Sequence, residues 1–233
     1  MRRILVPDRD TYLARWSVLH GGYDPRSSRF VSGWLGLAYV GARPLAARGL
    51  GPDAVTLAGV VVAAGVLGVT WAGVTWAGGG WVAAAGGLAV IAGLVDSMDG
   101  AVAVLTGRDT RTGFVLDSMA DRVGDVLFLA ALWRLGAPVG LVVAGGLATF
   151  LQEYLRARAA AAGMDDVGVV TVAERPTRVI VTAVTLGAGG LAAMAGLPGH
   201  GVRLLASAGG VAWAVLGAVG LVQLAVVVRR RLR

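Results

Sequence analysis

Cysteine and lysine are both absent from the 233-residue chain, and only 15% of its residues are charged. Without cysteine there is no disulfide framework, no thiol nucleophile and no thiolate metal site. Without lysine there is no Schiff-base chemistry, and all 21 basic side chains are arginine. Soluble domains carry about 25% charged residues, so the low share in this chain indicates a membrane protein.

Long apolar runs fill the sequence after Pro52, and 56% of all residues are hydrophobic. A helix that spans a bilayer needs about 20 consecutive apolar residues. We therefore predict an all-α integral membrane protein, with six transmembrane helices in one bundle. The predicted spans are 54–73, 81–105, 113–134, 137–158, 177–196 and 202–227. The 37 glycines suit the close helix packing found in lipid.

Residues 1–50 are more polar and predict an N-terminal cytoplasmic arm, followed by the six-helix domain at 51–233. Within the arm, the apolar stretch Phe30–Ala42 has an arginine at each end and predicts a short juxtamembrane amphipathic helix. Pro44 would stop or kink this helix. Two placements remain open: the helix lies in the membrane interface, or it packs on the bundle itself.

Most arginines fall on one side of a six-span arrangement, which places both termini in the cytoplasm of a multi-pass cell-membrane protein. The net charge of +7 is then explained by contact with anionic lipid headgroups. No nucleic-acid-binding motif is present, so nucleic acid is not an expected partner.

Four aspartates interrupt the second and third predicted spans: Asp96, Asp99, Asp117 and Asp121. Members of each pair lie three or four residues apart and therefore share one helix face. The short polar loop at 106–112 makes the two helices an antiparallel hairpin, so Asp99 lies opposite Asp117 and Asp96 opposite Asp121. Bare carboxylates are costly in lipid and repel one another. Divalent cations would hold them together, and hard oxygen ligands select Mg²⁺, Mn²⁺ or Ca²⁺.

Two such ions would clamp a pyrophosphate and stabilise in-line displacement at phosphorus. Three alternatives remain open for the four acids: ion pairs with arginines, a divalent-cation transporter, or a purely structural membrane protein. The arginines available for such pairs are Arg108, Arg111 and Arg122. Asp125, one turn beyond Asp121, is expected to be structural or to support the metal ligands.

This pattern resembles the CDP-alcohol phosphotransferase family, whose motif is D-x-x-D-G-x-x-A-R, eight residues, then G-x-x-x-D-x-x-x-D. The four aspartates match it with full spacing, and so do Gly100, Ala103 and Gly113. The segment Gly51–Thr56 resembles the family's Pro-Asn-x-x-Thr opening of the first span, with Asp53 in place of Asn. One position departs: Val104 stands where the motif has arginine, which leaves a non-catalytic or altered-specificity member open unless Arg108 or Arg111 takes over.

The resemblance implies an enzyme of phospholipid biosynthesis that moves a phosphatidyl group from CDP-diacylglycerol to an alcohol and releases CMP at the cytoplasmic face. It implies that the four aspartates bind Mg²⁺ or Mn²⁺, expected as two ions, and that Asp121 is also the catalytic base. It further implies a CDP-binding set: Asp53, Thr56, Gly100, Ala103, Arg108 and Gly113. Homodimers are common in the family, so a homodimer is expected by analogy.

The acceptor side is predicted from two segments that flank one cytoplasmic loop, Glu153–Arg158 and Glu174–Arg178. Arginines near a helix start at Pro176 would make an anion pocket, although positive-inside topology and capping explain them equally well. The elements Tyr-x-x-Ala-Arg and Glu-Arg-Pro-x-Arg are similar to those of phosphatidylinositol-phosphate synthases, which favours inositol phosphate as acceptor. Glycerol phosphate and small alcohols such as serine, inositol or ethanolamine stay open. The predicted acceptor-binding residues are Arg156, Arg158, Arg175 and Arg178.

Overall fold

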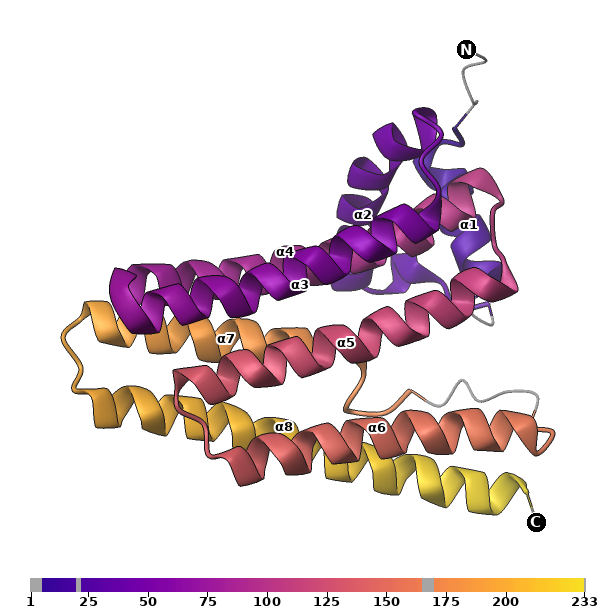
Figure 1. Cartoon of the computed structure of the whole chain (residues 1–233). Helices are drawn as coiled ribbons and strands as arrows, with labels where there is room; N and C mark the ends of the chain where they lie inside the picture. Colours follow the sequence, from indigo (N-terminus) through magenta and orange to yellow (C-terminus); the bar gives the residue numbers. More distant parts are fainter. Residues whose placement is uncertain (1–5, 20–21, 165–169, 233) are drawn as a thin grey trace. The chain divides into compact units, whose positions relative to one another are not determined.

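Every regular element in the computed structural model is helical over the residues that it describes, which are 6–19, 22–164 and 170–232 (Figure 1). The elements are α1 (Arg9–Leu19), η1 (Pro25–Ser27), α2 (Arg29–Ala47), α3 (Pro52–Ala72), η2 (Gly73–Ala77), α4 (Gly79–Thr106), α5 (Arg111–Leu135), α6 (Val139–Ala161), α7 (Arg175–Met194) and α8 (Gly199–Arg231). The first five residues of the predicted arm, and residues 165–169 of the predicted break before the fifth span, lie outside the described residues.

Helices α3 to α8 occupy the positions of the six predicted spans. By length and composition, four of the described helices are apolar enough to cross a membrane: Pro52–Ala77, Gly79–Thr106, Arg175–Met194 and Gly199–Arg231. Helices α5 and α6 carry more charged side chains, among them Asp117, Asp121 and Glu153, and this lowers their mean hydropathy. The sequence therefore encodes a multi-pass membrane protein whose middle helices hold its polar chemistry.

The predicted juxtamembrane helix is longer than the sequence indicated, because α2 runs from Arg29 to Ala47 and includes Pro44. Pro44 lies in the last turn, where a missing N–H removes only one intrahelical hydrogen bond. The helix therefore continues until the backbone N–H of Arg48 bonds the last carbonyls. At the other end, the Ser28 hydroxyl accepts a hydrogen bond from the N–H of Val31 and caps the first turn.

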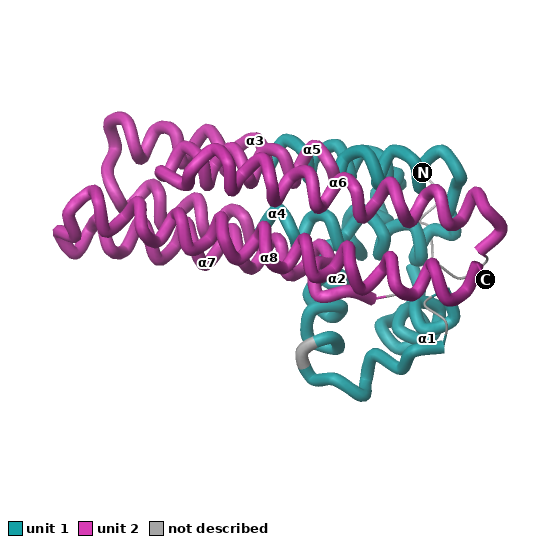
Figure 2. Tube along the Cα trace, turned by 90° about the horizontal axis from the view of Figure 1, so that it is seen from below, with its two compact units in different colours: residues 1–62, 91–121 teal, residues 63–90, 122–233 magenta. Residues whose placement is uncertain are grey.

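The chain forms two compact units, shown in different colours in Figure 2. Unit 1 contains residues 1–62 and 91–121, and unit 2 contains residues 63–90 and 122–233. Unit 1 has an apolar cluster that joins α1 and α2 to the C-terminal part of α4, through residues such as Tyr12, Tyr39 and Val102. In unit 2, α8 packs along both α6 and α7.

Tryptophans cluster at one end of the unit 2 helices, where α3 ends and α4 begins. Trp71, Trp76, Trp81 and Trp133 are each about half exposed or more. Beside them, the Arg134 guanidinium lies 4.7 Å from the centre of the Trp71 ring and donates a hydrogen bond to the Thr75 hydroxyl at 2.7 Å. Exposed tryptophans with a flanking arginine are typical of the level where a membrane helix meets the lipid headgroups.

Glycines allow α4 and α7 to touch backbone to backbone within unit 2. A Cβ at Gly86 would lie 2.7 Å from the carbonyl oxygen of Ala183 and 2.7 Å from the backbone nitrogen of Gly187. Gly190 of α7 is equally restricted, since its Cβ would lie 2.6 Å from the Gly79 carbonyl oxygen. Backbone atoms cannot move aside as flexible side chains do, so this crossing requires glycine.

We expect Gly86→Ala to lower the thermal unfolding temperature by several degrees, because overpacking of this kind costs about 1–3 kcal/mol. The matched control is Gly87→Ala, since a Cβ at the exposed Gly87 would meet no described atom within 4 Å. Alanine favours the helix equally at both positions, so the control should be unchanged or slightly more stable. Thermal unfolding in one detergent compares the two, and equal stability of both variants would contradict the backbone contact.

Candidate active site

Three carboxylates from two helices of unit 1 converge on one point. Asp96 of α4, with Asp117 and Asp121 of α5, each offers an oxygen, and these oxygens all lie within 4.8 Å of one another. The three side chains are partly buried. Ligand oxygens around one Mg²⁺ or Ca²⁺ lie about 2.0–2.6 Å from the ion, and so no more than about 5 Å from each other. The group therefore fits a hard divalent cation in both geometry and chemistry.

Asp99 lies outside this group of three and is held by its own partners. Its side chain is only 6% exposed. The Thr56 hydroxyl of α3 donates a hydrogen bond to Asp99 Oδ2 at 2.6 Å, and the Gly100 N–H lies 2.6 Å from Oδ1. Asp99 is still close enough to Asp117 and Asp121 to interact with them electrostatically. Asp99 therefore lies near two of the other predicted acids, and Thr56 orients its carboxylate.

The small residues of the motif differ in what surrounds them. Gly100 is exposed, and a Cβ there would meet no described atom within 4 Å. Packing within the described chain therefore gives no reason for glycine at position 100, and the surface beside Asp99 is left open. Gly113 is tighter, since its Cβ would lie 3.0 Å from Thr110 Oγ1 and 3.2 Å from Asp53 Oδ1.

The remaining predicted CDP-binding residues lie at the C-terminal end of α4 or shortly after it. Ala103 is partly buried in α4. Arg108 follows α4 and is exposed, and its Nη1 donates a hydrogen bond to the carbonyl oxygen of Gly49 at 3.3 Å. These residues belong to unit 1, as the aspartates do.

Arginines of unit 2 surround a buried carboxylate, Asp125, which is only 1% exposed. Asp125 Oδ1 lies 3.1 Å from Arg178 Nε and 3.8 Å from Arg175 Nη1, and its Oδ2 lies 3.3 Å from Arg122 Nη2. Three cations therefore compensate one buried charge, which is the condition for keeping it ionised away from water. The expectation that Asp125 is structural agrees with these contacts.

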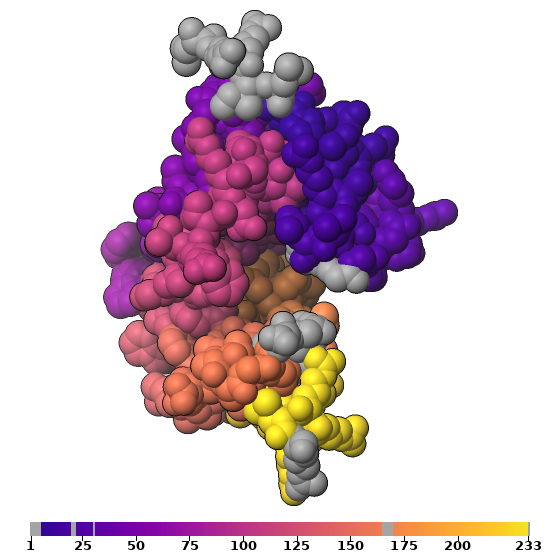
Figure 3. Space-filling view, turned by 90° about the vertical axis from the view of Figure 1, so that its right-hand side faces the viewer, coloured from indigo at the N-terminus to yellow at the C-terminus, as the bar shows by residue number. Residues whose placement is uncertain are grey.

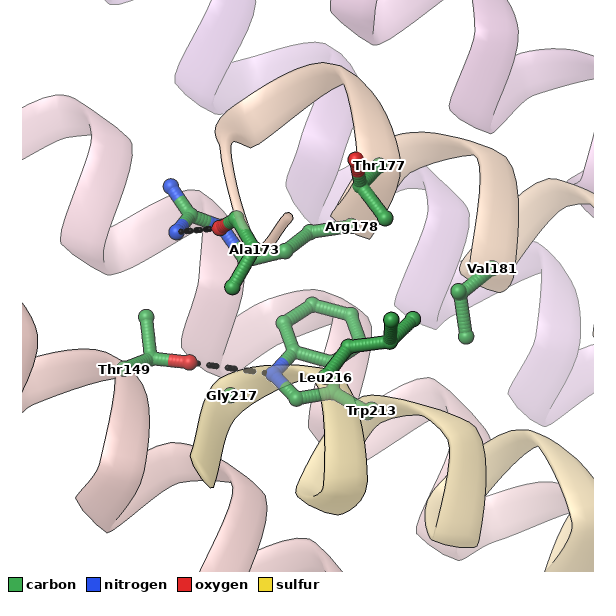
Figure 4. Close-up of a pocket in the computed structure, with 8 residues that line it drawn as sticks. All are labelled: Thr149, Ala173, Thr177, Arg178, Val181, Trp213, Leu216 and Gly217. Atoms are coloured by element: carbon green, nitrogen blue, oxygen red, sulfur yellow. Dashed lines mark hydrogen bonds between the residues drawn. The ribbon is translucent and has the colours of Figure 1, made fainter. Parts of the chain in front are cut away.

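Arg178 is less available than the sequence suggested, because it is only 5% exposed. Its Nη1 donates a hydrogen bond to the Ala173 carbonyl oxygen at 2.8 Å, and the Trp213 indole donates to Thr149 Oγ1 nearby at 3.1 Å (Figure 4). These groups belong to the lining of a small internal cavity, with Thr177, Val181, Leu216 and Gly217 (Figure 4). Arg178 therefore supports the interior of unit 2, and its acceptor role stays a prediction.

Arg156 is held by a hydrogen-bond chain that the sequence did not reveal. The buried Gln152 amide donates to Thr171 Oγ1 at 2.9 Å, and the Thr171 hydroxyl donates to Glu174 Oε1 at 2.9 Å. Arg156 Nη2 donates to the same Glu174 oxygen at 3.0 Å. Arg158, in the last turn of α6, is exposed. The segment before α7 thus fixes one of the predicted acceptor arginines and leaves another at the surface.

Glu174 has a lowered pKa despite its partial burial. Burial alone would raise the pKa of this carboxyl, but the Thr171 N–H, the Arg156 guanidinium and the Thr171 hydroxyl together hold it below its ordinary value of 4.5. Glu174 is also the N-cap residue of α7, where the helix dipole favours a negative charge. It is therefore an ionised anchor for the segment that joins α6 to α7.

A family model described as CDP-alcohol phosphatidyltransferase matches residues 50–219. The chain belongs to the CDP-alcohol phosphatidyltransferase family. The match includes every aspartate of the converging group and extends through α7 into α8.

Two curated relatives to which the chain is similar are phosphatidylinositol phosphate synthases. The chain is 36% identical to that of Mycolicibacterium smegmatis over 166 residues, which are 65% of this chain and 69% of the relative. It is 40% identical to that of Corynebacterium glutamicum over 115 residues, 44% of this chain and 51% of the relative. The matched part spans from 37% to 69% of the length of the curated relatives that the chain matches.

The phosphatidylinositol phosphate synthase of Mycobacterium tuberculosis provides solved structures for comparison. One, in complex with manganese and citrate, has a TM-score of 0.64 and 28% identity, and the match covers 82% of this chain and 88% of that one. Another has CDP-DAG bound, with a TM-score of 0.60 and 27% identity, and the match covers 80% and 92% of the two chains.

Gln152 and Thr171 are the polar residues that sequence reasoning missed in this family member. Gln152 carried a signal, since an amide inside a predicted span must find a hydrogen-bond partner. Thr171 carried none, because a threonine in a loop is ordinary. Only the folded segment shows that its hydroxyl joins Gln152 to Glu174.

We expect the stability of the protein to fall as the pH drops below about 4.5, the ordinary pKa of Glu174, and further as it passes through the lowered folded value. A depressed carboxyl pKa stabilises the folded state above the unfolded pKa, and protonation removes that contribution. Thermal unfolding measured against pH should therefore show a smaller acid-induced loss for Glu174→Gln than for the wild type.

Two variants at Thr171 distinguish the effect of its hydroxyl on the pKa of Glu174 from the effect of its backbone N–H. Thr171→Val removes the hydroxyl that donates to Glu174, whereas Thr171→Ser keeps it. The valine variant should show a weaker pH dependence, and the serine variant should behave as the wild type. Identical pH profiles for all four proteins would show that Glu174 is not the group responsible.

Proposed function

We propose that the chain is a membrane enzyme that transfers the phosphatidyl group of CDP-diacylglycerol to an alcohol acceptor and releases CMP. The observation that carries this proposal is the convergence of Asp96, Asp117 and Asp121 from two neighbouring helices. Family membership and the CDP-DAG-bound structure of a relative support the choice of donor.

We propose that the acids bind Mg²⁺ or Mn²⁺ and that Asp99 joins the other three in holding two ions. When bound, such ions neutralise the pyrophosphate and stabilise charge at the phosphorus under attack. The manganese complex of the M. tuberculosis relative supports this choice. The number of ions and the preference for Mg²⁺ or Mn²⁺ are part of this proposal. The partial burial of the three carboxylates supports a site that is shielded from solvent but still open to ligands.

The roles of the remaining residues follow from where they lie. Asp121 is proposed to accept the proton of the acceptor hydroxyl as a new P–O bond forms and the bond to the CMP phosphate breaks. Thr56 holds Asp99 in place through its hydroxyl. The open surface at Gly100 lets the nucleotide approach α4 closely. Asp53, Ala103, Arg108 and Gly113 complete the proposed CDP-binding set.

Inositol phosphate is the proposed acceptor, because a phosphate-bearing acceptor requires cations and the predicted acceptor segments are rich in arginine. Arg158 is exposed, and Arg156 and Arg175 are partly buried; their guanidinium groups are the kind of cation that suits a phosphate. Arg178 acts in support by holding Asp125. The names of the relatives support the same acceptor class.

The proposed membrane placement has α3 to α8 all crossing the bilayer, with both termini and the active site at the cytoplasmic face of the cell membrane. This orientation is supported by the arginines within residues 6–48, by Arg108 and by the arginines in the last turn of α8. The arm at 1–50, with α2 at the lipid interface, and the transmembrane domain at 51–233 form the proposed division of the chain. A homodimer remains an expectation by analogy with the family.

We expect the purified protein to release CMP from CDP-diacylglycerol only when Mg²⁺ or Mn²⁺ and an acceptor are present. Asp117→Asn should reduce this release by more than about 100-fold, because even partners of metal ligands are worth 10–100-fold. The same variant should lose most of its affinity for Mn²⁺, which can be measured by calorimetry without any turnover.

Asp109→Asn is the matched control, since Asp109 lies exposed in the turn between α4 and α5. It removes the same charge and should keep both Mn²⁺ binding and CMP release. Full turnover of the folded Asp117→Asn variant would overturn the metal assignment.

We expect inositol phosphate to support CMP release at least about tenfold better than inositol, since a hydrogen bond to a charged group is worth about 1.5–3 kcal/mol. Glycerol phosphate, serine and ethanolamine, assayed one at a time with the same donor, complete the comparison. Turnover with one of these and none with inositol phosphate would identify a different acceptor while leaving the transfer reaction intact.

A further inference from the structure

The N-terminal arm is attached to the helix that carries Asp96 and Asp99. The Trp34 indole of α2 donates a hydrogen bond to Ser97 Oγ of α4 at 2.9 Å. Gly41 lies so close to α4 that a Cβ there would be 2.7 Å from Met98 Sδ. Ser97 and Met98 lie between the two acids in the sequence. The arm is therefore a built part of unit 1 and fixes the rotation of α4 about its axis.

Helix α1 extends this contact to the last turn of α4. Tyr12 and Leu13 are 1% and 3% exposed and belong to the apolar cluster, and the side chain of Val104 packs against the same cluster. Figure 3 shows the indigo atoms of the N-terminal residues beside pink atoms from the middle of the chain. Position 104, where the family motif has arginine, is thus used in this chain to receive the arm.

An arginine of the arm reaches the backbone at this position. Arg15 of α1 is exposed at the edge of the packed face, and its Nη1 donates to the carbonyl oxygen of Val104 at 3.5 Å. A guanidinium has five N–H donors, so this one long contact leaves others for a ligand. A positive charge therefore lies at residue 104 although the side chain at 104 is apolar.

We propose that Arg15 binds a phosphate group of the CDP-linked donor, so that the N-terminal arm completes the donor site. This inference rests on the proposed function and extends it to a residue outside the motif. Arginine is suited to the role because its planar fork binds phosphate oxygens in pairs. Arg108, whose Nη1 donates to the Gly49 carbonyl oxygen, is a separate member of the proposed CDP-binding set.

The test measures binding of CDP-diacylglycerol to the full-length protein in uncharged detergent with Mn²⁺ present. Arg15→Gln should raise the Kd about tenfold, as loss of one charge-assisted contact implies. Arg15→Lys, which keeps the charge but not the planar fork, should give an intermediate Kd. Arg26→Gln removes another exposed positive charge of the arm, one paired with Asp10, and should bind as the wild type.

The assay measures affinity for the donor, so its result does not depend on whether the protein catalyses the proposed reaction. A wild type that binds the donor tightly but releases no CMP would reject the reaction, while the Kd of Arg15→Gln would still decide the role of Arg15. An unchanged Kd for Arg15→Gln would overturn the proposal. Equal weakening of donor binding by Arg26→Gln would also overturn it. If Arg15→Gln weakened only the binding to phosphatidylglycerol vesicles, Arg15 would make a general contact with lipid headgroups, and the proposal would fail.

Discussion

Mutual repulsion among aspartates in an apolar setting is the constraint on which the rest of this structure depends. Asp96, Asp117 and Asp121 place oxygens within 4.8 Å of one another, and ionised carboxylates at that spacing repel one another unless positive charge compensates them. The surroundings of the group are consistent with this requirement. Asp99 is oriented by Thr56, Gly100 leaves open space, and the arm contacts α4 through Ser97 and Met98.

Unit 2 also contains acids that are shielded from water, and groups of the same unit compensate their charge. There the buried acid Asp125 is compensated by arginines of its own chain, and Glu174 is held by hydrogen bonds from Thr171 and Arg156. Such closed networks rigidify the parts that they connect, since an unsatisfied charge in the interior is costly. Asp125 and Glu174 are therefore balanced by groups of the chain itself.

The sequence was sufficient for the helices and the aspartates because both follow from strict periodicity. Apolar runs of spanning length predicted α3 to α8, and the spacing of three and four predicted which acids share a face. Prediction from the sequence failed where the position of a residue depends on tertiary contacts. The continuation of α2 past Pro44, the burial of Arg178 and the meeting of Arg15 with Val104 each involve residues whose local pattern is unremarkable. Long-range contacts of this kind have no periodicity to reveal them.

The apolar cluster of unit 1 joins Tyr12 and Leu13 to Val102 and Leu105, about ninety positions later in the chain. Ribosomal synthesis delivers the first pair long before the second, and two membrane-crossing stretches must be inserted in between. Until then the arm lacks the surface that buries its aromatic residues. The α1 segment, which is made before α4, is thus among the last to reach its native packing, and closing so large a loop is intrinsically slow.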